Sequence, residues 1–135
     1  MAIALETPAY LEGGFTREPQ VVSPMYLTGS FVIDDTNDHQ FKVDGKGKSK
    51  MTVLVANASA LRIQTVKVYG MHAIDALIDA VGSKQIGATF TVGVSTTEYR
   101  TVADPFPFYC VQITSAAADA GVPVCTVFID FHSGS

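Results

Sequence analysis

The residue types that most often perform chemistry in proteins are few in this sequence and lie far apart. Of its three histidines, His39, His72 and His132, none has another histidine or a cysteine within about four residues. A zinc site needs about three or four converging His, Cys, Asp or Glu side chains, usually from closely spaced pairs. The sequence also lacks a nucleophile elbow, a P-loop and a glycine-rich dinucleotide motif. We therefore expect no catalytic residue, no metal site and no cofactor.

The densest polar cluster is the run 34–39, in which five consecutive side chains carry oxygen. Because Ca²⁺ takes about six to eight oxygen ligands, this run is a candidate calcium loop. It lacks the central glycine and the terminal glutamate of an EF-hand loop, however. Asp and Asn also favour turns, since their side chains hydrogen-bond the neighbouring backbone. We predict a turn here and keep calcium binding as the alternative.

The two cysteines, Cys110 and Cys125, fall in the apolar segments 108–115 and 122–131. If these segments form a hairpin around the alanine-rich stretch between them, a symmetric register places Cys110 opposite Cys125. Directly opposed residues bring their Cβ atoms within about 5 Å, which is close enough for a disulfide. Two buried thiols are the alternative. We favour the thiols, because the N-terminus lacks the basic start of a secretory signal and a reducing compartment is expected.

Most of the chain after residue 27 alternates apolar and polar residues, as half-buried strands do. The segment LRIQTVKVY (61–69) is the clearest case, and it is expected to pair with 50–56. About eight short strands separated by turn residues indicate a mainly β fold, an antiparallel sandwich or a jelly-roll-like barrel. The predicted strands are 28–34, 40–43, 50–56, 61–69, 88–94, 98–103, 108–115 and 122–131.

Residues 72–81 break this alternation. Apolar residues recur there at helical spacing, the aspartates of the stretch fall on the opposite face, and Gly82 follows as a natural stop. The spacing predicts one short helix that closes an end of the sheet structure. The apolar residues of the predicted helical face are Ala73, Ile74, Leu77, Ile78 and Val81.

Residues 1–27 follow neither period, and prolines and glycines interrupt them. The stretch is nevertheless rich in apolar residues, unlike a hydrophilic linker. We predict an extended N-terminal arm (1–27) that lies along another surface, of its own domain or of a neighbour, and a β-sandwich domain over 28–135. The candidate interface residues of the arm are Ile3, Leu5, Tyr10, Leu11, Phe15, Val21, Val22, Met25 and Tyr26.

The charge of the chain narrows the classes of partner. Charged residues make up only 16% of the sequence and the net charge is −4, which argues against nucleic acid because phosphate binding relies on Lys and Arg. The lysine-rich stretch 42–50 has no aromatic residue for base stacking and is interpreted as a hairpin turn. No apolar run approaches the roughly 20 residues of a membrane span, so no membrane partner is expected. A surface this poor in charge is typical of chains that pack against other proteins.

Two stretches carry a resemblance to a known group of proteins. LRIQTVKVYG (61–70) and, after an insertion, YRTVADPFPFYCVQITSAAADAGVPVCTVFIDF (99–131) are similar to the second half of small β-sandwich structural proteins of tailed-bacteriophage particles, of the capsid decoration (cement) type. In those proteins a strand with a VYG-like end precedes a P-F/Y-x-Y-x-x-V-x-I strand and a final V-x-V-F-I-D-type strand. The resemblance covers about a third of the chain and lies outside the arm and the predicted helix.

The resemblance implies a non-enzymatic virion protein, made in the host cytoplasm, that binds the major capsid protein or another virion protein. Decoration proteins tend to assemble as trimers or dimers and to clamp shell subunits with extended termini, which residues 1–27 would do here. A protein that binds only the assembled shell stabilises it by mass action. The alternative is a carbohydrate- or ligand-binding β-sandwich module, including a phage neck, tail or fibre component, with the 34–39 loop as its best candidate site.

Overall fold

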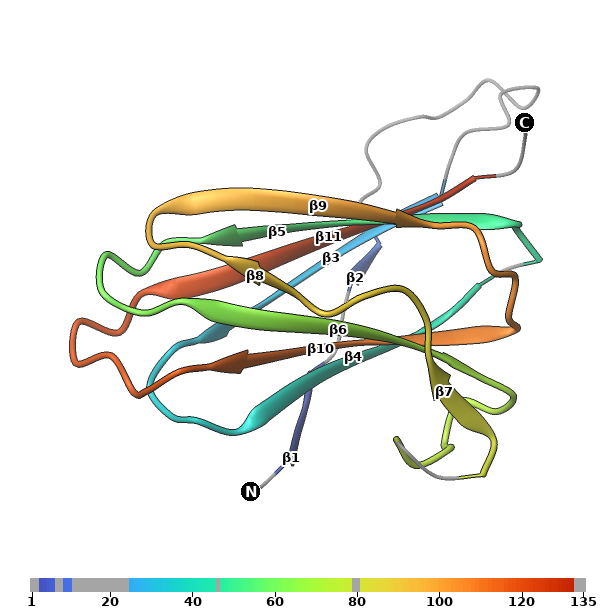
Figure 1. Ribbon diagram of the computed structural model, residues 1–135, viewed down its shortest axis with the longest axis horizontal. Helices are drawn as coiled ribbons and strands as arrows, with labels where there is room; N and C mark the ends of the chain where they lie inside the picture. The colour runs from blue at the N-terminus through green and yellow to red at the C-terminus, as the bar shows by residue number, and fades with distance from the viewer. Residues whose placement is uncertain (1–2, 7–8, 11–24, 46, 79–80, 133–135) are drawn as a thin grey trace.

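The computed structural model describes residues 3–6, 9–10, 25–45, 47–78 and 81–132, and these form two β-sheets packed face to face (Figure 1). The strands are β1 (Ile3–Glu6), β2 (Ala9–Tyr10), β3 (Met25–Val32), β4 (Asp38–Asp44), β5 (Lys50–Asn57), β6 (Gln64–Met71), β7 (Ser83–Gln85), β8 (Phe90–Val92), β9 (Thr96–Val102), β10 (Phe108–Ser115) and β11 (Val124–His132). Sheet A has six strands in the order β1-β4-β10-β6-β7, with β8 also paired to β6, and sheet B has five in the order β2-β3-β11-β5-β9. The fold is therefore an open sandwich and not a closed barrel.

The mainly β prediction is confirmed, and each of the eight predicted segments overlaps a strand. These strands are β3 to β6 and β8 to β11. The additional strands β1, β2 and β7 are short, and two of them belong to the predicted arm. Strand β1 runs parallel to β4, so sheet A is mixed and not purely antiparallel.

Both predicted hairpins are wrong, because the chain crosses to the other sheet where a hairpin was expected. Strand β5 lies in sheet B and β6 in sheet A, and β10 and β11 are separated in the same way. The lysine-rich stretch 42–50 likewise leads from β4 in sheet A to β5 in sheet B. Alternation shows which side of a strand faces the core, but that pattern is the same in either sheet of a sandwich. It therefore cannot choose a strand's neighbour.

The expected facing pair of cysteines is consequently absent. Cys110 packs with Tyr69 and Met71 in a small cluster apart from the main core, whereas Cys125 belongs to the main core between the sheets. Both are buried free thiols, as the favoured alternative predicted. Burial raises the pKa of each thiol to about 12, which makes both poor nucleophiles.

The helix predicted over 72–81 is wrong for its described residues, 72–78 and 81, which form bends, turns and irregular backbone. Strand β7 pairs with β6, and the backbone N–H of His72 donates to the carbonyl of Gly82 at 3.0 Å. A ten-residue helix would hold its ends about 15 Å apart, so this closure excludes it. Most of the predicted apolar face is exposed instead, including Ile74, Leu77 and Val81. None of the described residues belongs to a helix long and apolar enough to cross a membrane.

The core lies between the two sheets and takes alternate side chains from each long strand. Its members are almost entirely aliphatic or aromatic, and burying each one contributes roughly 2 kcal/mol. The fully buried members include Ile33, Phe41, Met51, Val53, Val55, Val66, Val111, Ile113, Val127, Ile129 and Phe131. Because the inner faces are filled in this way, binding is left to the outer faces, the edges and the loops.

One end of the sandwich, at the left in Figure 1, is closed by a buried polar network, and we call it the network end. Asn57 Nδ2 donates to the carbonyls of Arg62 at 2.8 Å and Gly93 at 3.0 Å, and its Oδ1 accepts from the Ser59 N–H at 3.0 Å. Ser59 Oγ donates to Asp119 Oδ2 at 2.5 Å. These bonds join loops that belong to both sheets.

The opposite end is closed by aromatic packing, and we call it the aromatic end. The ring of Phe106 lies against Gly70 so closely that a Cβ there would overlap it, and a Cβ at Gly45 would come within 2.8 Å of the Tyr109 ring. The Tyr109 hydroxyl donates to the carbonyl of Asp104 at 2.9 Å and accepts from the Phe106 N–H at 3.1 Å. This end therefore depends on close contact between rings and glycines.

Candidate functional site

The outer face of sheet A carries a recess beside the loop that follows β6. Residues after β6 fold back over part of this face, where Ala76 and Ile78 pack on the cluster of Tyr69, Met71 and Cys110. The Lys42 ammonium holds this loop by donating to the carbonyl of Ala76 at 3.0 Å. The rest of the face stays uncovered and forms a recess beside the loop.

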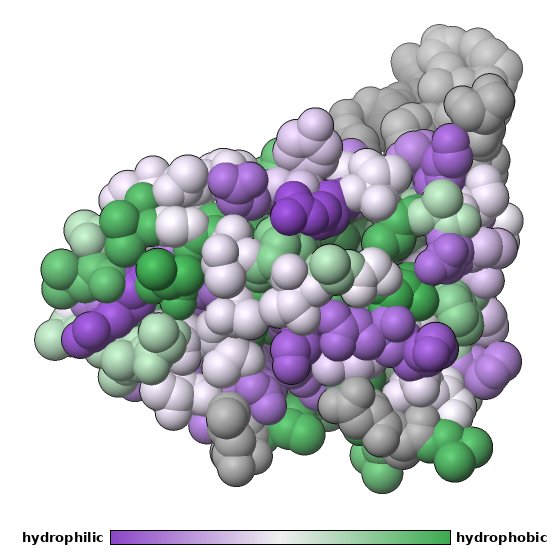
Figure 2. All heavy atoms as spheres, viewed as in Figure 1, coloured by the Kyte–Doolittle hydropathy of each residue, from purple (hydrophilic) through white to green (hydrophobic). Residues whose placement is uncertain are grey.

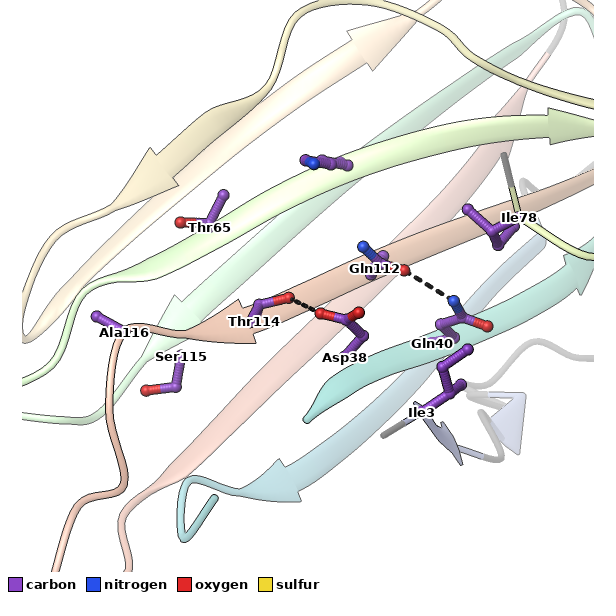
Figure 3. Close-up of a pocket in the computed structure, with 10 residues that line it drawn as sticks. Ile3, Asp38, Gln40, Thr65, Ile78, Gln112, Thr114, Ser115 and Ala116 are labelled. Atoms are coloured by element: carbon purple, nitrogen blue, oxygen red, sulfur yellow. Dashed lines mark hydrogen bonds between the residues drawn. The ribbon is translucent and has the colours of Figure 1, made fainter. Parts of the chain in front are cut away.

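This recess, which we call the sheet A groove, has a volume of about 480 Å³ and a polar floor (Figure 3). Gln40 Nε2 donates to Gln112 Oε1 at 2.7 Å across β4 and β10, and Thr114 Oγ1 donates to Asp38 Oδ1 at 2.6 Å. The remaining lining residues are Ile3, Thr65, Lys67, Ile78, Ser115 and Ala116.

The groove offers amides, hydroxyls, one carboxylate and one ammonium to a ligand. It has no cysteine or histidine among its lining residues, and no aromatic ring on which a sugar or base would stack. Within the part of the chain that the structure describes, no group of three or more His, Cys, Asp or Glu is placed to hold a metal ion. Such a lining suits hydrogen bonding to a polar molecule.

Next to the groove, four exposed aliphatic side chains form what we call the apolar patch: Ile3, Leu5, Ile74 and Leu77. Their exposed fractions are 57%, 66%, 44% and 71%. Leu5, Ile74 and Leu77 line a depression of about 450 Å³. Figure 2 shows hydrophobic atoms along the lower margin of the molecule, where β1 and the loop between β6 and β7 lie in Figure 1. The patch joins the N-terminal strand to the loop that was predicted to be a helix.

Strand β1 is held in place by a buried histidine. His39 Nδ1 lies 2.6 Å from Glu6 Oε2 in β1, and His39 Nε2 lies 2.9 Å from Asp35 Oδ1. The imidazole ring stacks on Phe31 at a centroid distance of 3.8 Å. The hydrogen bond to His39 is the main reason that the pKa of Asp35 lies below its ordinary value. The N-terminal strand is therefore tied to sheet A by side chains as well as by the β ladder, which turns Ile3 and Leu5 outward.

The first part of the 34–39 run forms the predicted turn, with a bend at Asp34 and Asp35, whereas Asp38 and His39 already belong to β4. Asp35 Oδ1 accepts from the backbone N–H of Asn37 at 3.0 Å, as an Asx-turn requires, and Asp35 Oδ2 accepts from Asn37 Nδ2 at 3.1 Å. The role of His39 was missed by sequence reasoning. The sequence feature that could have indicated this role is the four-residue spacing between His39 and Asp35, which brings the two side chains together across the bend.

Of the predicted interface residues, Ile3 and Leu5 are exposed on β1. Tyr10 is in β2, and Met25 and Tyr26 are in β3. The side chains of these three, together with Leu11, Phe15, Val21 and Val22, lie outside what the structure describes. Ile74 and Leu77 were predicted to be helical and enter the site instead as part of the apolar patch.

A second exposed apolar surface lies at the network end and was not predicted. Leu61, Val94 and Val122 are exposed there on three different loops. Val122 has a φ of 49°, an unfavourable backbone conformation for a β-branched residue. The sequence feature that could have indicated this surface is the presence of aliphatic residues in turns, where side chains are not directed into the core by the alternation of a strand.

No protein-family model matches this chain, and no curated protein matches it either. The predicted resemblance to phage decoration proteins therefore finds no support in sequence families. Several solved structures share its fold. The Yersinia pseudotuberculosis-derived mitogen is 9% identical with a TM-score of 0.56, over 84% of this chain and 91% of that chain. CorA, a surface-associated copper-binding protein of Methylomicrobium album BG8, is 9% identical with a TM-score of 0.53, over 98% of this chain and 100% of that chain.

A viral particle protein is among the weaker likenesses. The structure of infectious bursal disease virus Gx strain is 11% identical with a TM-score of 0.32, over 90% of this chain and 38% of that chain. At 9% identity, the likenesses to the mitogen and to CorA show a shared fold only, and fold alone does not assign function.

Proposed function

We propose that this chain is a non-enzymatic virion structural protein, a capsid decoration protein that binds and stabilises the assembled shell through its N-terminal arm and the adjoining edge of the sandwich. The apolar patch is the observation that carries this proposal. Four large aliphatic side chains are exposed there: Ile3 and Leu5 on β1, the strand that His39 holds in place, and Ile74 and Leu77 on the loop between β6 and β7. The major capsid protein, or another virion protein, is the expected partner, and the virion is the expected location.

The chemistry of the patch fits a protein partner. Burying an exposed aliphatic side chain contributes about 1–2 kcal/mol, so the four together supply several kcal/mol toward association. Glu6, Lys42 and Asp75 line the same depression as Leu5, Ile74 and Leu77. An apolar centre with a charged rim is the usual build of a protein interface.

Co-sedimentation with empty shells, assembled from the major capsid protein of the same genome, tests this proposal. The unchanged chain is expected to sediment with the shells and to raise their melting temperature. Leu5→Asp and Leu77→Asp are each expected to weaken binding at least about tenfold, because a carboxylate would be buried in the apolar patch. Both positions are more than half exposed in the free chain, so the variants should fold normally.

Leu61→Asp is the matched control, since Leu61 is as exposed as Leu5 but lies at the network end. It is expected to bind shells as the unchanged chain does. If Leu61→Asp lost binding while Leu5→Asp and Leu77→Asp kept it, the apolar patch would not be the shell-binding surface. If none of the chains bound shells, the decoration role would be rejected.

The sheet A groove favours a second candidate function, a carbohydrate- or ligand-binding module. Gln40 and Gln112 form an amide pair at the floor of a recess, and such pairs bind hydroxyl groups well. Glycan-array binding that is lost on Gln112→Ala and kept on Leu5→Asp would support this function in place of the first.

A further inference from the structure

Strand β9 lies at one edge of sheet B, opposite the edge formed by β2, and it is seven residues long. It pairs with β5 on one side, and among the described residues no strand pairs with its other side. In Figure 1 it runs along the upper margin of the molecule. An edge strand of this length exposes unpaired backbone groups that another strand can bind.

The side chains of β9 alternate between the two faces of sheet B. Glu98 and Arg100 pair with the core residues Val55 and Val53 and so lie on the inner side. Tyr99 pairs with Leu54 on the outer side and is 62% exposed. Arg100 is held at the edge, with its guanidinium 4.5 Å from the centroid of the Phe90 ring and donating to the carbonyl of Tyr99 at 3.0 Å.

The sequence of this strand is complementary to itself when it is read backwards. Around Tyr99 the order is Thr97-Glu98-Tyr99-Arg100-Thr101. In an antiparallel pair centred on Tyr99, Glu98 of each copy stands opposite Arg100 of the other. Threonines stand opposite threonines, and the two tyrosines face each other. Opposite charges and Thr–Thr pairs at directly opposed positions both stabilise a sheet.

We propose that two copies of this chain form a symmetric dimer by antiparallel pairing of their β9 strands about a two-fold axis at Tyr99. The two B sheets then become one continuous ten-strand sheet. On its outer face, the row Phe128–Leu54–Tyr99 continues into the same row of the second copy. This inference stands on β9 alone and does not depend on the proposed shell binding.

The charges also select the register. A shift of two residues in one direction places Glu98 opposite Glu98 of the partner copy, and the opposite shift places Arg100 opposite Arg100. Parallel pairing in register likewise brings identical charges side by side. Like charges at opposed positions are destabilising, so only the register centred on Tyr99 satisfies both charged residues.

Light scattering of the full chain over a range of concentrations tests the dimer. The unchanged chain is expected to reach twice its monomer mass. Glu98→Arg and Arg100→Glu each place like charges opposite one another and are expected to lower the association constant about ten- to a hundredfold. An equimolar mixture of the two variants restores both charge pairs, so it should recover a heterodimer. A monomer at all concentrations, or a mixture that stays monomeric, would overturn the proposal.

Cross-linking gives a second test that does not depend on charge. Opposed strand residues have Cα atoms about 4.5–5.5 Å apart, within the range of a disulfide, so Tyr99→Cys should form a covalent dimer on mild oxidation. Thr101→Cys is the control, because Thr101 faces Thr97 of the other copy and its Cα lies about 14 Å from that of the second Thr101. The native cysteines are both buried and do not interfere. Efficient cross-linking of Thr101→Cys, or none of Tyr99→Cys, would exclude the register.

Discussion

The two ends of the sandwich are closed by different kinds of interaction. At the network end, Asn57, Ser59 and Asp119 tie loops of both sheets together by hydrogen bonds. At the aromatic end, Phe106 and Tyr109 pack against glycines of sheet A and its loops. Each end must hold together loops that cross between sheets, because neighbouring strands in the sequence seldom pair.

The difference between the ends has consequences for function. Directional hydrogen bonds fix the positions of loops whose tips carry exposed aliphatic residues, such as Leu61 and Val122. The packing of Phe106 and Tyr109 against glycines tolerates little increase in side-chain volume, and these contacts involve no ionised group. We therefore expect the network end to respond to pH and to loss of a polar side chain, and the aromatic end to respond to added volume.

The largest effect is expected from Asn57→Ala. This change leaves the Ser59 N–H and the carbonyls of Arg62 and Gly93 without the bonds that the buried amide supplies. Each unsatisfied buried group costs about 1–3 kcal/mol, so we expect a loss of about 3 kcal/mol in the free energy of unfolding, measured with urea. Asn37→Ala removes an amide from a partly exposed bend and should cost less than about 1 kcal/mol. Equal losses would contradict the importance of the network.

Gly70→Ala is expected to cost about 2 kcal/mol, since its Cβ overlaps the Phe106 ring and overpacking forces the surroundings to move. Gly121→Ala is the control, because a Cβ at Gly121 comes no closer than 3.6 Å to Asp119 Oδ1. Urea unfolding of both variants measures the difference. If Gly70→Ala were as stable as the unchanged chain, the aromatic end would be more loosely packed than described.

A smaller effect should distinguish the two ends by the way in which the stability cost of a substitution depends on pH. The hydrogen bond from Ser59 lowers the pKa of Asp119, and the bond to His39 lowers that of Asp35. A carboxyl group whose pKa is lower in the folded state contributes stability above its unfolded pKa of about 3.9 and loses it as the pH falls through the folded value. The cost of Asp119→Asn should therefore shrink as the pH is lowered below about 4, whereas the cost of Gly70→Ala should stay constant.

Asp130 on sheet B should have the opposite effect on stability, because burial raises the pKa of its carboxyl group. Its charged form is disfavoured on folding, so Asp130→Asn is expected to stabilise the chain at neutral pH and to have no such benefit in acid. Unfolding curves at a series of pH values compare the three variants. A constant cost for Asp119→Asn across that series would show that the network does not rely on an ionised carboxylate.

The smallest effect is expected at Val122, whose φ of 49° is strained for a β-branched side chain. Asn adopts this conformation more readily, so Val122→Asn should raise the free energy of unfolding by about 0.5 kcal/mol. Val124→Asn is the control, since Val124 is also exposed but lies in β11. There Asn should lower stability, because it fits a strand poorly. A destabilising effect of Val122→Asn would indicate that the Val122 side chain has a packing role.

The strands and their buried sides could be predicted from the sequence, because alternation with a period of two follows directly from strand geometry. Segment 50–56, for example, is a strand with every second residue buried, and segment 108–115 follows the same pattern except at Cys110, which is buried on the other side of the sheet. The helix prediction failed because apolar residues at helical spacing in 72–81 are also compatible with a loop, which the pairing of β6 with β7 closes. Ile3 and Leu5 could be named as candidate interface residues from composition, but the strand that turns them outward could not be predicted.

Local chemistry along the chain determined which residues prefer extended backbone, which sides of the strands are apolar, that the thiols are buried and that the chain bends at Asp34 and Asp35. Only the tertiary structure decided the neighbours of each strand, since both sheets bury the same pattern of side chains. It also decided that Glu6 meets His39, that Leu5 meets Ile74 and Leu77, and that β9 lies at an edge. These contacts join residues far apart in the sequence, and no local preference encodes which distant strand fills the remaining place in a sheet.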